Sequence, residues 1–163
     1  MDSTPLTFTR LSEAGLDAFL RLATDEHIRR YLLDGAVADA DWARAEVQRS
    51  DRLFEREGVG LWLVSVDEQP VGFAGFRVFE DLEPEPQLLY ALLERVTGRG
   101  YATLAARWLV NEARQQGWSR VGAGVDEVNA ASVRVLEKAG FVYLRSVEGS
   151  LGPTRLYALT LGE

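Results

Sequence analysis

The sequence predicts an α/β fold that forms a single domain over residues 1–163. The chain has 163 residues, 47% of them hydrophobic, which is enough for one buried core. Strand-like and helix-like hydrophobic patterns follow one another without a linker, a repeat or a low-complexity segment. The clearest pattern is an apolar strand at 88–93, a loop with two glycines, and an amphipathic helix that starts at Tyr101.

The first half of the chain is predicted to hold three strands and three helices. They are a strand at 6–11, helices at 13–23, 25–31 and 39–57, and strands at 61–66 and 71–79. Asp39 or Asp41 caps the long helix, and Gly58 ends it. The last two strands form a hairpin around residues 67–70.

The second half is predicted to alternate between strands and helices. An acidic loop with two prolines, at 81–86, leads into it. The expected elements are a strand at 88–93, a helix at 101–116, a strand at 121–125, a helix at 129–139, and strands at 142–147 and 155–161. Gly117 and Gly140 follow the two helices, as C-terminal glycines do. A turn at 149–153 joins the last two strands.

The loop before the first of these helices is a candidate binding site for an anion. Residues 95–103 read RVTGRGYAT. The glycines let the backbone approach a ligand closely, and the first helical turn offers free N–H groups and the positive end of the helix dipole, which suit phosphate. Two common nucleotide loops are excluded, because no Gly-Lys-Ser/Thr follows and Thr103 replaces the third glycine of Gly-x-Gly-x-x-Gly. From spacing alone, an ordinary strand-to-helix turn is an equally good interpretation.

A second segment, about thirty residues later, favours the interpretation of the loop as a binding site. Residues 129–141 read NAASVRVLEKAGF. Together with the loop, this segment resembles the GCN5-related N-acetyltransferase (GNAT) family, and in particular the branch that acetylates the N-termini of ribosomal proteins. Arg95, Gly98 and Gly100 match the family signature Gln/Arg-x-x-Gly-x-Gly/Ala. The resemblance is firm over residues 88–141, and the predicted order of elements matches the family layout along the whole chain.

The resemblance implies the GNAT fold, a single mixed, mostly antiparallel sheet of about seven strands flanked by helices. Its central strands, here 88–93 and 121–125, splay apart and admit the pantetheine arm of acetyl-CoA, which is the expected cosubstrate. The family implies no metal. By family likeness the residues that bind acetyl-CoA are Leu92, Leu93, Arg95, Val96, Gly98, Arg99, Gly100, Tyr101, Ala102, Asn129 and Ser132.

These residues have different expected roles. Backbone N–H groups from Val96 to Ala102 would hold the pyrophosphate, and Arg95 and Arg99 would pair with its charge. Backbone groups near Leu92 and Leu93 would bind the arm as an added strand, and one N–H group would polarise the acetyl carbonyl.

Asn129 and Ser132 are the expected catalytic residues of the second segment. By family likeness, Asn129 hydrogen-bonds the arm, and Ser132 faces the sulfur and protonates or stabilises the leaving thiolate. Both residues also suit a helix cap, and this structural interpretation has nearly equal weight. Many relatives carry a tyrosine where this chain has Leu136, which leaves Ser132 as the acid, and Tyr143 is expected in the core.

The general base is harder to assign. Relatives often carry a glutamate where this chain has Gln87, which cannot act as a base. Glu94, next to the loop, is the candidate; the other acids able to act through water are Glu80, Asp81, Glu83 and Asp126. An α-amino group, with a pKa of about 7.7–8.0, needs less help than a lysine with a pKa of about 10.4. The weak base machinery therefore favours a protein or peptide N-terminal α-amine as the acceptor.

The composition excludes several other classes of function. The chain has no cysteine, so disulfides, thiolate metal sites and an acyl-cysteine are excluded, and its one histidine, His27, is expected on the surface. A net charge of −7 argues against a nucleic-acid partner. No apolar run approaches about eighteen residues and the N-terminus does not resemble a signal peptide, so we expect no membrane association and a cytoplasmic location.

Two alternatives to N-terminal acetylation stay open at this point. The first is acetylation of a small amine such as an aminoglycoside, a polyamine or an amino acid. The second is a GNAT domain that binds CoA without turnover, which the missing tyrosine and glutamate keep open. The resemblance also leaves room for a homodimer.

Overall fold

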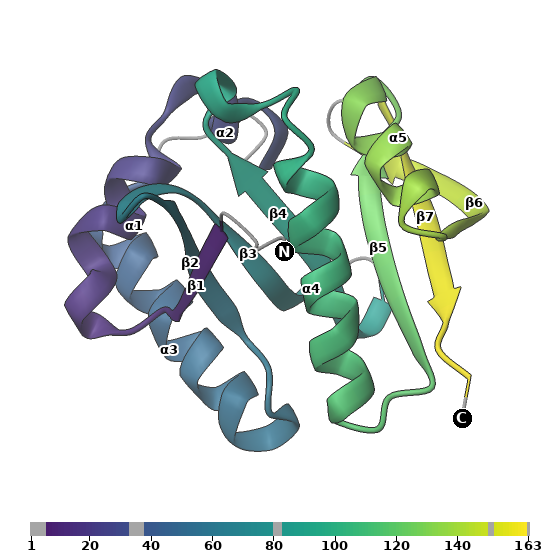
Figure 1. Cartoon of the computed structure of the whole chain (residues 1–163), viewed down its shortest axis with the longest axis horizontal. Helices are drawn as coiled ribbons and strands as arrows, with labels where there is room; N and C mark the ends of the chain where they lie inside the picture. Colours follow the sequence, from purple (N-terminus) through teal and green to yellow (C-terminus); the bar gives the residue numbers. More distant parts are fainter. Residues whose placement is uncertain (1–5, 33–37, 80–82, 150–151, 163) are drawn as a thin grey trace.

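A computed structural model of the chain describes residues 6–32, 38–79, 83–149 and 152–162 (Figure 1). The strands form one seven-stranded sheet in the order β1-β2-β3-β4-β5-β7-β6. Their bounds are β1 Leu6–Arg10, β2 Leu61–Val66, β3 Gln69–Phe79, β4 Glu83–Leu92, β5 Arg120–Asp126, β6 Val142–Gly149 and β7 Gly152–Thr160. All neighbouring strands are antiparallel except β4 and β5, which confirms the predicted mixed, mostly antiparallel sheet.

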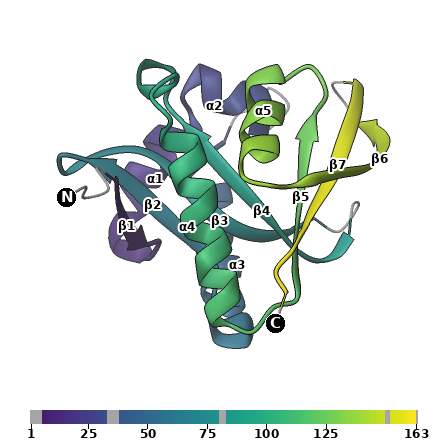
Figure 2. The ribbon, with the colours of Figure 1, turned by 45° about the vertical axis from the view of Figure 1, so that its right-hand side comes forward.

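Helices cover both faces of the sheet. They are α1 Leu16–Ala23, α2 Glu26–Leu32, α3 Ala40–Glu57, α4 Tyr101–Gln115 and α5 Ala130–Lys138, with short 3-10 turns at Glu13–Gly15 and Glu94–Val96. Figure 2 shows α4 across one face of the sheet and α3 behind it. Alternation along β4 divides the core in the same way: Leu88 and Leu92 pack with α4, whereas Leu89 and Ala91 pack with α1 and α3.

Two side-chain contacts fix the long helices to the sheet. Trp108 of α4 stacks on Phe8 of β1, with ring centroids 3.9 Å apart. On the other face, the buried carboxylate of Glu46 in α3 accepts two hydrogen bonds from Arg77 of β3, at 2.8 and 2.9 Å. Helices α3 and α4 are therefore held at defined positions on opposite faces of the sheet.

The central strands diverge, as the family resemblance implies. β4 and β5 pair only at Gln87 with Gly122 and at Leu88 with Ala123, although both strands continue beyond these residues. A Cβ at Gly122 would lie 2.9 Å from the Gln87 amide, so glycine lets the two strands meet at this point. Beyond Ala123 the carboxyl ends of both strands separate (Figure 1).

The predicted acidic loop at 81–86 is wrong in its second part, because β4 already begins at Glu83. β4 pairs with β5 only from Gln87 onward, and its pairing with β3 is irregular between Arg77 and Phe79. Pro84 and Pro86 therefore lie in a part of β4 that makes few hydrogen bonds to its neighbouring strands. Proline, which has no N–H group, is tolerated at such positions. The candidate bases Glu80 and Asp81 lie outside the described residues.

Other element boundaries move by a few residues. The Asp39 carboxylate accepts the N–H of Trp42 at 2.8 Å, which identifies Asp39 as the cap of α3. The first hairpin turns at Asp67 and Glu68, both with positive φ, and residues 69–70 belong to β3. β6 and β7 are also longer than expected, and the pair Gly149 and Gly152 replaces most of the predicted turn.

Candidate active site

A cavity of about 510 Å³ occupies the gap between the diverging strands. Its walls are residues 88–92 of β4, residues 123–126 of β5, the loop and first turn of α4, and one side of α5. His27 of α2 and Glu148 of β6 also line it. His27 is half-buried on the cavity wall rather than on the open surface that the sequence suggested. The cavity therefore joins the segments at 88–103 and 129–138.

Gly98 and Gly100 shape the end of this cavity at α4. Their φ angles are +79° and +81°, which favours glycine, and a Cβ at either would meet no protein atom within 4 Å. Gly100 is the N-cap of α4, no side chain caps the helix, and its first turn has no acidic residue. Residues 100–103 line the cavity, so the N-terminal N–H groups of α4 face a space that an anion can enter.

The preceding turn uses some N–H groups that the sequence assigned to the ligand. The N–H of Val96 donates to the carbonyl of Leu93 at 3.1 Å, and the N–H of Thr97 donates to that of Glu94 at 3.0 Å. The Val96 side chain is buried in the core. The N–H groups still suited to a phosphate group therefore begin at Gly98.

Backbone groups of β4 also face the gap. The N–H of Leu93 donates to Val71 of β3 at 2.8 Å, so this group is not free for a ligand. Antiparallel neighbours alternate between bonded and non-bonded pairs, and in this register Ala91 is the next bonded residue. The N–H and C=O groups of Tyr90 and Leu92 therefore point away from β3, toward the space where β5 has diverged.

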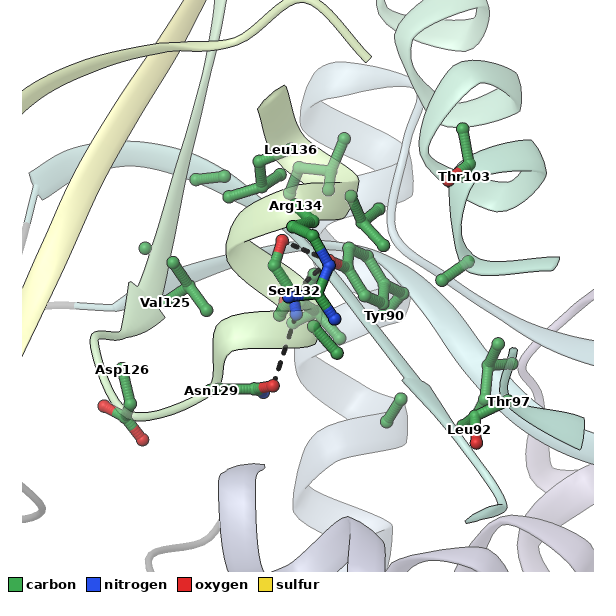
Figure 3. A pocket seen from close by; sticks show the side chains of 18 of the residues that line it. Tyr90, Leu92, Thr97, Thr103, Val125, Asp126, Asn129, Ser132, Arg134 and Leu136 are labelled. Carbon is green, nitrogen blue, oxygen red and sulfur yellow. Dashed lines mark hydrogen bonds between the residues drawn. The ribbon is translucent and has the colours of Figure 1, made fainter. Parts of the chain in front are cut away.

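Two polar contacts order the start of α5, and one of them joins it to β4 (Figure 3). The Asn129 side chain caps the helix, and its Oδ1 accepts the Ser132 N–H at 3.3 Å. The Ser132 hydroxyl instead contacts Tyr90, with the two hydroxyl oxygens 2.6 Å apart. Asn129, Ser132 and Tyr90 all line the cavity.

Tyr90 is a polar residue of this site that sequence reasoning missed. Burial raises the pKa of the Tyr90 phenol to about 12, and the hydrogen bond with Ser132 lowers it by a smaller amount. The phenol therefore stays protonated at neutral pH. The strand alternation that places Leu88 and Leu92 toward α4 also places Tyr90 there, and this was the available signal.

Charged groups are divided between the cavity walls. Arg134 and Lys138 line it from α5, whereas Asp126 and Glu148 line it from the ends of β5 and β6. The hydroxyl of Thr154 donates to Asp126 at 3.3 Å. One wall therefore suits an anionic ligand and the other a cationic one.

The structure brings some predicted site residues to the cavity and leaves others outside it. Those on the cavity wall are Leu92, Gly98, Gly100, Tyr101, Ala102, Asn129 and Ser132; those outside it are Leu93, Glu94, Arg95, Val96 and Arg99. Glu94, Arg95 and Arg99 are exposed, and Gln87 is buried against Gly122 and does not line the cavity.

The sequence also matches a known family over most of its length. The family described as "Acetyltransferase (GNAT) domain" matches residues 5–142. This chain belongs to the GNAT acetyltransferase family. The match contains the strand, the glycine loop and the start of α5 that form the cavity. A search of curated protein sequences finds no match.

Solved structures of GNAT proteins share the fold of this family member. An acetyltransferase from Agrobacterium tumefaciens is 22% identical, with a TM-score of 0.78, covering 98% of this chain and 92% of its own. RimL, a ribosomal L7/L12 α-N-protein acetyltransferase solved with CoA, is 19% identical, with a TM-score of 0.81 and coverage of 97% and 95%. The aminoglycoside acetyltransferase AAC(6')-Ib, also solved with CoA, is 21% identical, with a TM-score of 0.75 and coverage of 96% and 95%.

The described residues of this GNAT domain contain neither a metal-binding group nor a membrane-spanning helix. Its described residues include no group of three or more His, Cys, Asp or Glu side chains that could hold a metal ion. Within the same residues, no helix is long and apolar enough to cross a membrane.

Proposed function

We propose that this chain transfers an acetyl group from acetyl-CoA directly to a primary amine, the N-terminal α-amine of a protein or peptide. The observation that carries the proposal is the cavity between β4 and β5, which ends at the uncapped N-terminus of α4. An elongated thioester with a pyrophosphate at one end fits this combination of an apolar gap and an anion site. The CoA complexes of structures with the same fold support the proposal.

The cavity residues have separate roles in binding acetyl-CoA. N–H groups of Gly98 and residues 100–103 hold the pyrophosphate, and Arg134 and Lys138 of α5 supply positive charge in the same cavity. The gap-facing backbone of Tyr90 and Leu92 binds the pantetheine arm as an added strand.

The transfer step uses few side chains. The amine nitrogen bonds to the acetyl carbonyl carbon, the carbon–sulfur bond breaks, and its electron pair leaves on sulfur. The Leu92 N–H, which points into the gap, stabilises the carbonyl oxygen. The Ser132 hydroxyl donates a hydrogen bond to the departing thiolate. The nitrogen then loses a proton to water, and the sulfur gains one from water.

Asp126 replaces Glu94 as the acid best placed to assist deprotonation through water. Glu94 is exposed and does not line the cavity, whereas Asp126 lies on its wall. An amine that is partly neutral at pH 7 needs less help from a base than a lysine does, so an α-amine remains the favoured acceptor.

A small cationic amine is the second candidate acceptor. Asp126 and Glu148 on one wall would attract such a molecule, and the aminoglycoside acetyltransferase of the same fold supports this alternative. A CoA-binding domain without turnover is the third. The single domain over 1–163, the cytoplasmic location and a homodimer stay parts of the proposal.

The deciding experiment is a screen of amines with labelled acetyl-CoA. Matched peptides with either the α-amine or the lysine side chain blocked are compared with aminoglycosides and polyamines at pH 7. Label in the peptide with a free α-amine is expected. Label confined to small amines would select the second candidate, and CoA binding without any labelled product would select the third.

A further inference from the structure

We propose that Tyr90 is a positioning residue for Ser132, and that its hydroxyl directs the single Ser132 hydroxyl hydrogen toward the thioester sulfur. The inference rests on the proposed function, and it adds a residue to the reaction. Tyr90 lies on β4 and Ser132 on α5, 42 residues apart in sequence, and both line the cavity (Figure 3).

The geometry allows two arrangements of the two hydroxyl hydrogens. The Tyr90 oxygen lies 2.6 Å from the Ser132 Oγ and 3.3 Å from the Ser132 carbonyl oxygen. In the first arrangement, Ser132 donates to Tyr90 and Tyr90 donates to the carbonyl. In the second, Tyr90 donates to the Ser132 Oγ, and the Ser132 hydrogen is free to point into the cavity.

The second arrangement is favoured when negative charge develops on a sulfur atom in the cavity. The Ser132 hydroxyl hydrogen is then attracted to the sulfur. The Tyr90 hydroxyl donates a hydrogen bond to the Ser132 oxygen, which replaces the hydrogen bond that Ser132 would otherwise make with Tyr90. The 2.6 Å contact between the hydroxyls is present in both arrangements, and the second gives up only the longer, 3.3 Å contact of Tyr90 with the Ser132 carbonyl oxygen. Without the phenol, the Ser132 hydroxyl loses this partner and rotates more freely.

Tyr90 acts as a donor and not as a base. Its phenol is protonated at neutral pH, since the ordinary pKa of 10.0 is already well above 7 and burial raises it further. No proton leaves Tyr90 or Ser132 during transfer. Both residues only orient hydrogen bonds, and the proton that the sulfur gains comes from water.

The test is a double-mutant cycle with Tyr90→Phe, Ser132→Ala and the combined variant. Phenylalanine keeps the ring that packs against the core, so only the hydroxyl is lost. Tyr90→Phe should lower kcat about tenfold, the effect of one ordinary hydrogen bond, with KM for acetyl-CoA within about twofold. The combined variant should be no slower than Ser132→Ala, since Tyr90 acts only through Ser132.

The chain offers a matched control pair. Tyr143 is exposed on β6, so its predicted place in the core is wrong. Its hydroxyl oxygen lies 2.8 Å from that of Ser146, and neither residue lines the cavity. Tyr143→Phe removes a similar hydrogen bond and should leave kcat unchanged. Melting temperatures of all variants show whether a lower kcat reflects a loss of folded protein.

A second readout does not need turnover. The thiol of bound CoA is titrated through the ultraviolet absorbance of its thiolate. Its pKa should be lower in the wild type than in Tyr90→Phe or Ser132→Ala, and the two variants should agree. An unchanged thiol pKa and kcat in Tyr90→Phe, or rate losses that multiply in the combined variant, would overturn this inference alone. A wild-type protein that binds no CoA would overturn the proposed function as well.

Discussion

At the scale of single residues, Asn129 and Ser132 divide two tasks that the sequence could not separate. The Asn129 Oδ1 caps α5 through the Ser132 N–H, whereas the Ser132 hydroxyl contacts Tyr90. The capping interpretation therefore applies to Asn129, and the Ser132 side chain takes no part in it. The Asn129 amide nitrogen remains available for a hydrogen bond to a ligand in the cavity.

Substitution at Asn129 separates capping from ligand binding. Asn129→Ala should lower the free energy of unfolding by about 1 kcal/mol, the usual cost of losing an N-cap. Asn129→Asp keeps the capping oxygen, so stability should be retained, but it loses the amide donor and CoA should bind more weakly. Denaturant unfolding and calorimetry with CoA measure the two effects. If Asn129→Asp binds CoA as tightly as the wild type, the Asn129 amide makes no hydrogen bond to CoA.

The raised pKa of Tyr90 predicts a loss of stability in alkali. The folded-state pKa of about 12 lies above the ordinary value of 10.0, so the neutral phenol is favoured by folding. Its contribution is complete below pH 10 and is lost as the pH rises toward 12, amounting to about 2–3 kcal/mol. Wild type should therefore lose more unfolding free energy between pH 9.5 and 11.5 than Tyr90→Phe. Equal losses would show that the phenol is not desolvated.

At the scale of elements, the loop before α4 combines backbone shape with a helix terminus. Gly98 and Gly117 both have positive φ, 79° and 81°, and a Cβ at either position meets no protein atom within 4 Å. Gly98 lines the cavity and Gly117 follows the far end of α4. These two glycines therefore form a matched pair that differs mainly in closeness to the proposed ligand.

Tryptophan at the two glycines tests the location of the pyrophosphate. Gly98→Trp should weaken CoA binding by at least about tenfold, because the indole fills the space beside the α4 N-terminus. Gly117→Trp should bind CoA like the wild type, with a similar loss of stability from the strained φ. Calorimetry with CoA measures the affinities. Saturating CoA, at about 100 times its Kd, should also raise the unfolding free energy of wild type by about 2.7 kcal/mol. Unchanged binding in Gly98→Trp would reject this site.

At the scale of the whole molecule, the splayed sheet forms one cavity with two differently charged regions. The cavity connects the anion-binding end at α4 with the wall that contains Asp126 and Glu148. An enzyme can therefore hold the amine and the thioester together, an effect worth up to about 7–11 kcal/mol in favourable cases. The chain has no cysteine, the commonest carrier of an acyl group.

Direct transfer should leave the protein unmodified. Incubation with labelled acetyl-CoA alone, followed by intact-mass measurement, should show no stoichiometric acetyl-enzyme. The preference for an α-amine over a lysine should narrow as the pH rises from 7 to 9, because the lysine becomes partly neutral. A labelled intermediate that passes its acetyl group to substrate, or a preference for lysine at pH 7, would contradict this mechanism.

Much of the fold could be predicted because its signals are local. Hydrophobic periodicity located the strands and helices, and glycines marked the ends of α3 and α4. The family resemblance then predicted that the two central strands splay apart. The start of β4 was missed because two prolines indicated a loop, whereas the absence of a β5 partner beside them makes these prolines acceptable in a strand.

The sequence by itself determined the family, because two short patterns, the glycine loop at 95–103 and the segment at 129–141, occur together in one chain. Only the tertiary structure decided which groups reach the cavity. It joined Tyr90 to Ser132, left Glu94 exposed, and bonded the Leu93 N–H to β3. The physical reason is that such contacts depend on strand register and on side-chain direction across the sheet, and a one-residue difference reverses both.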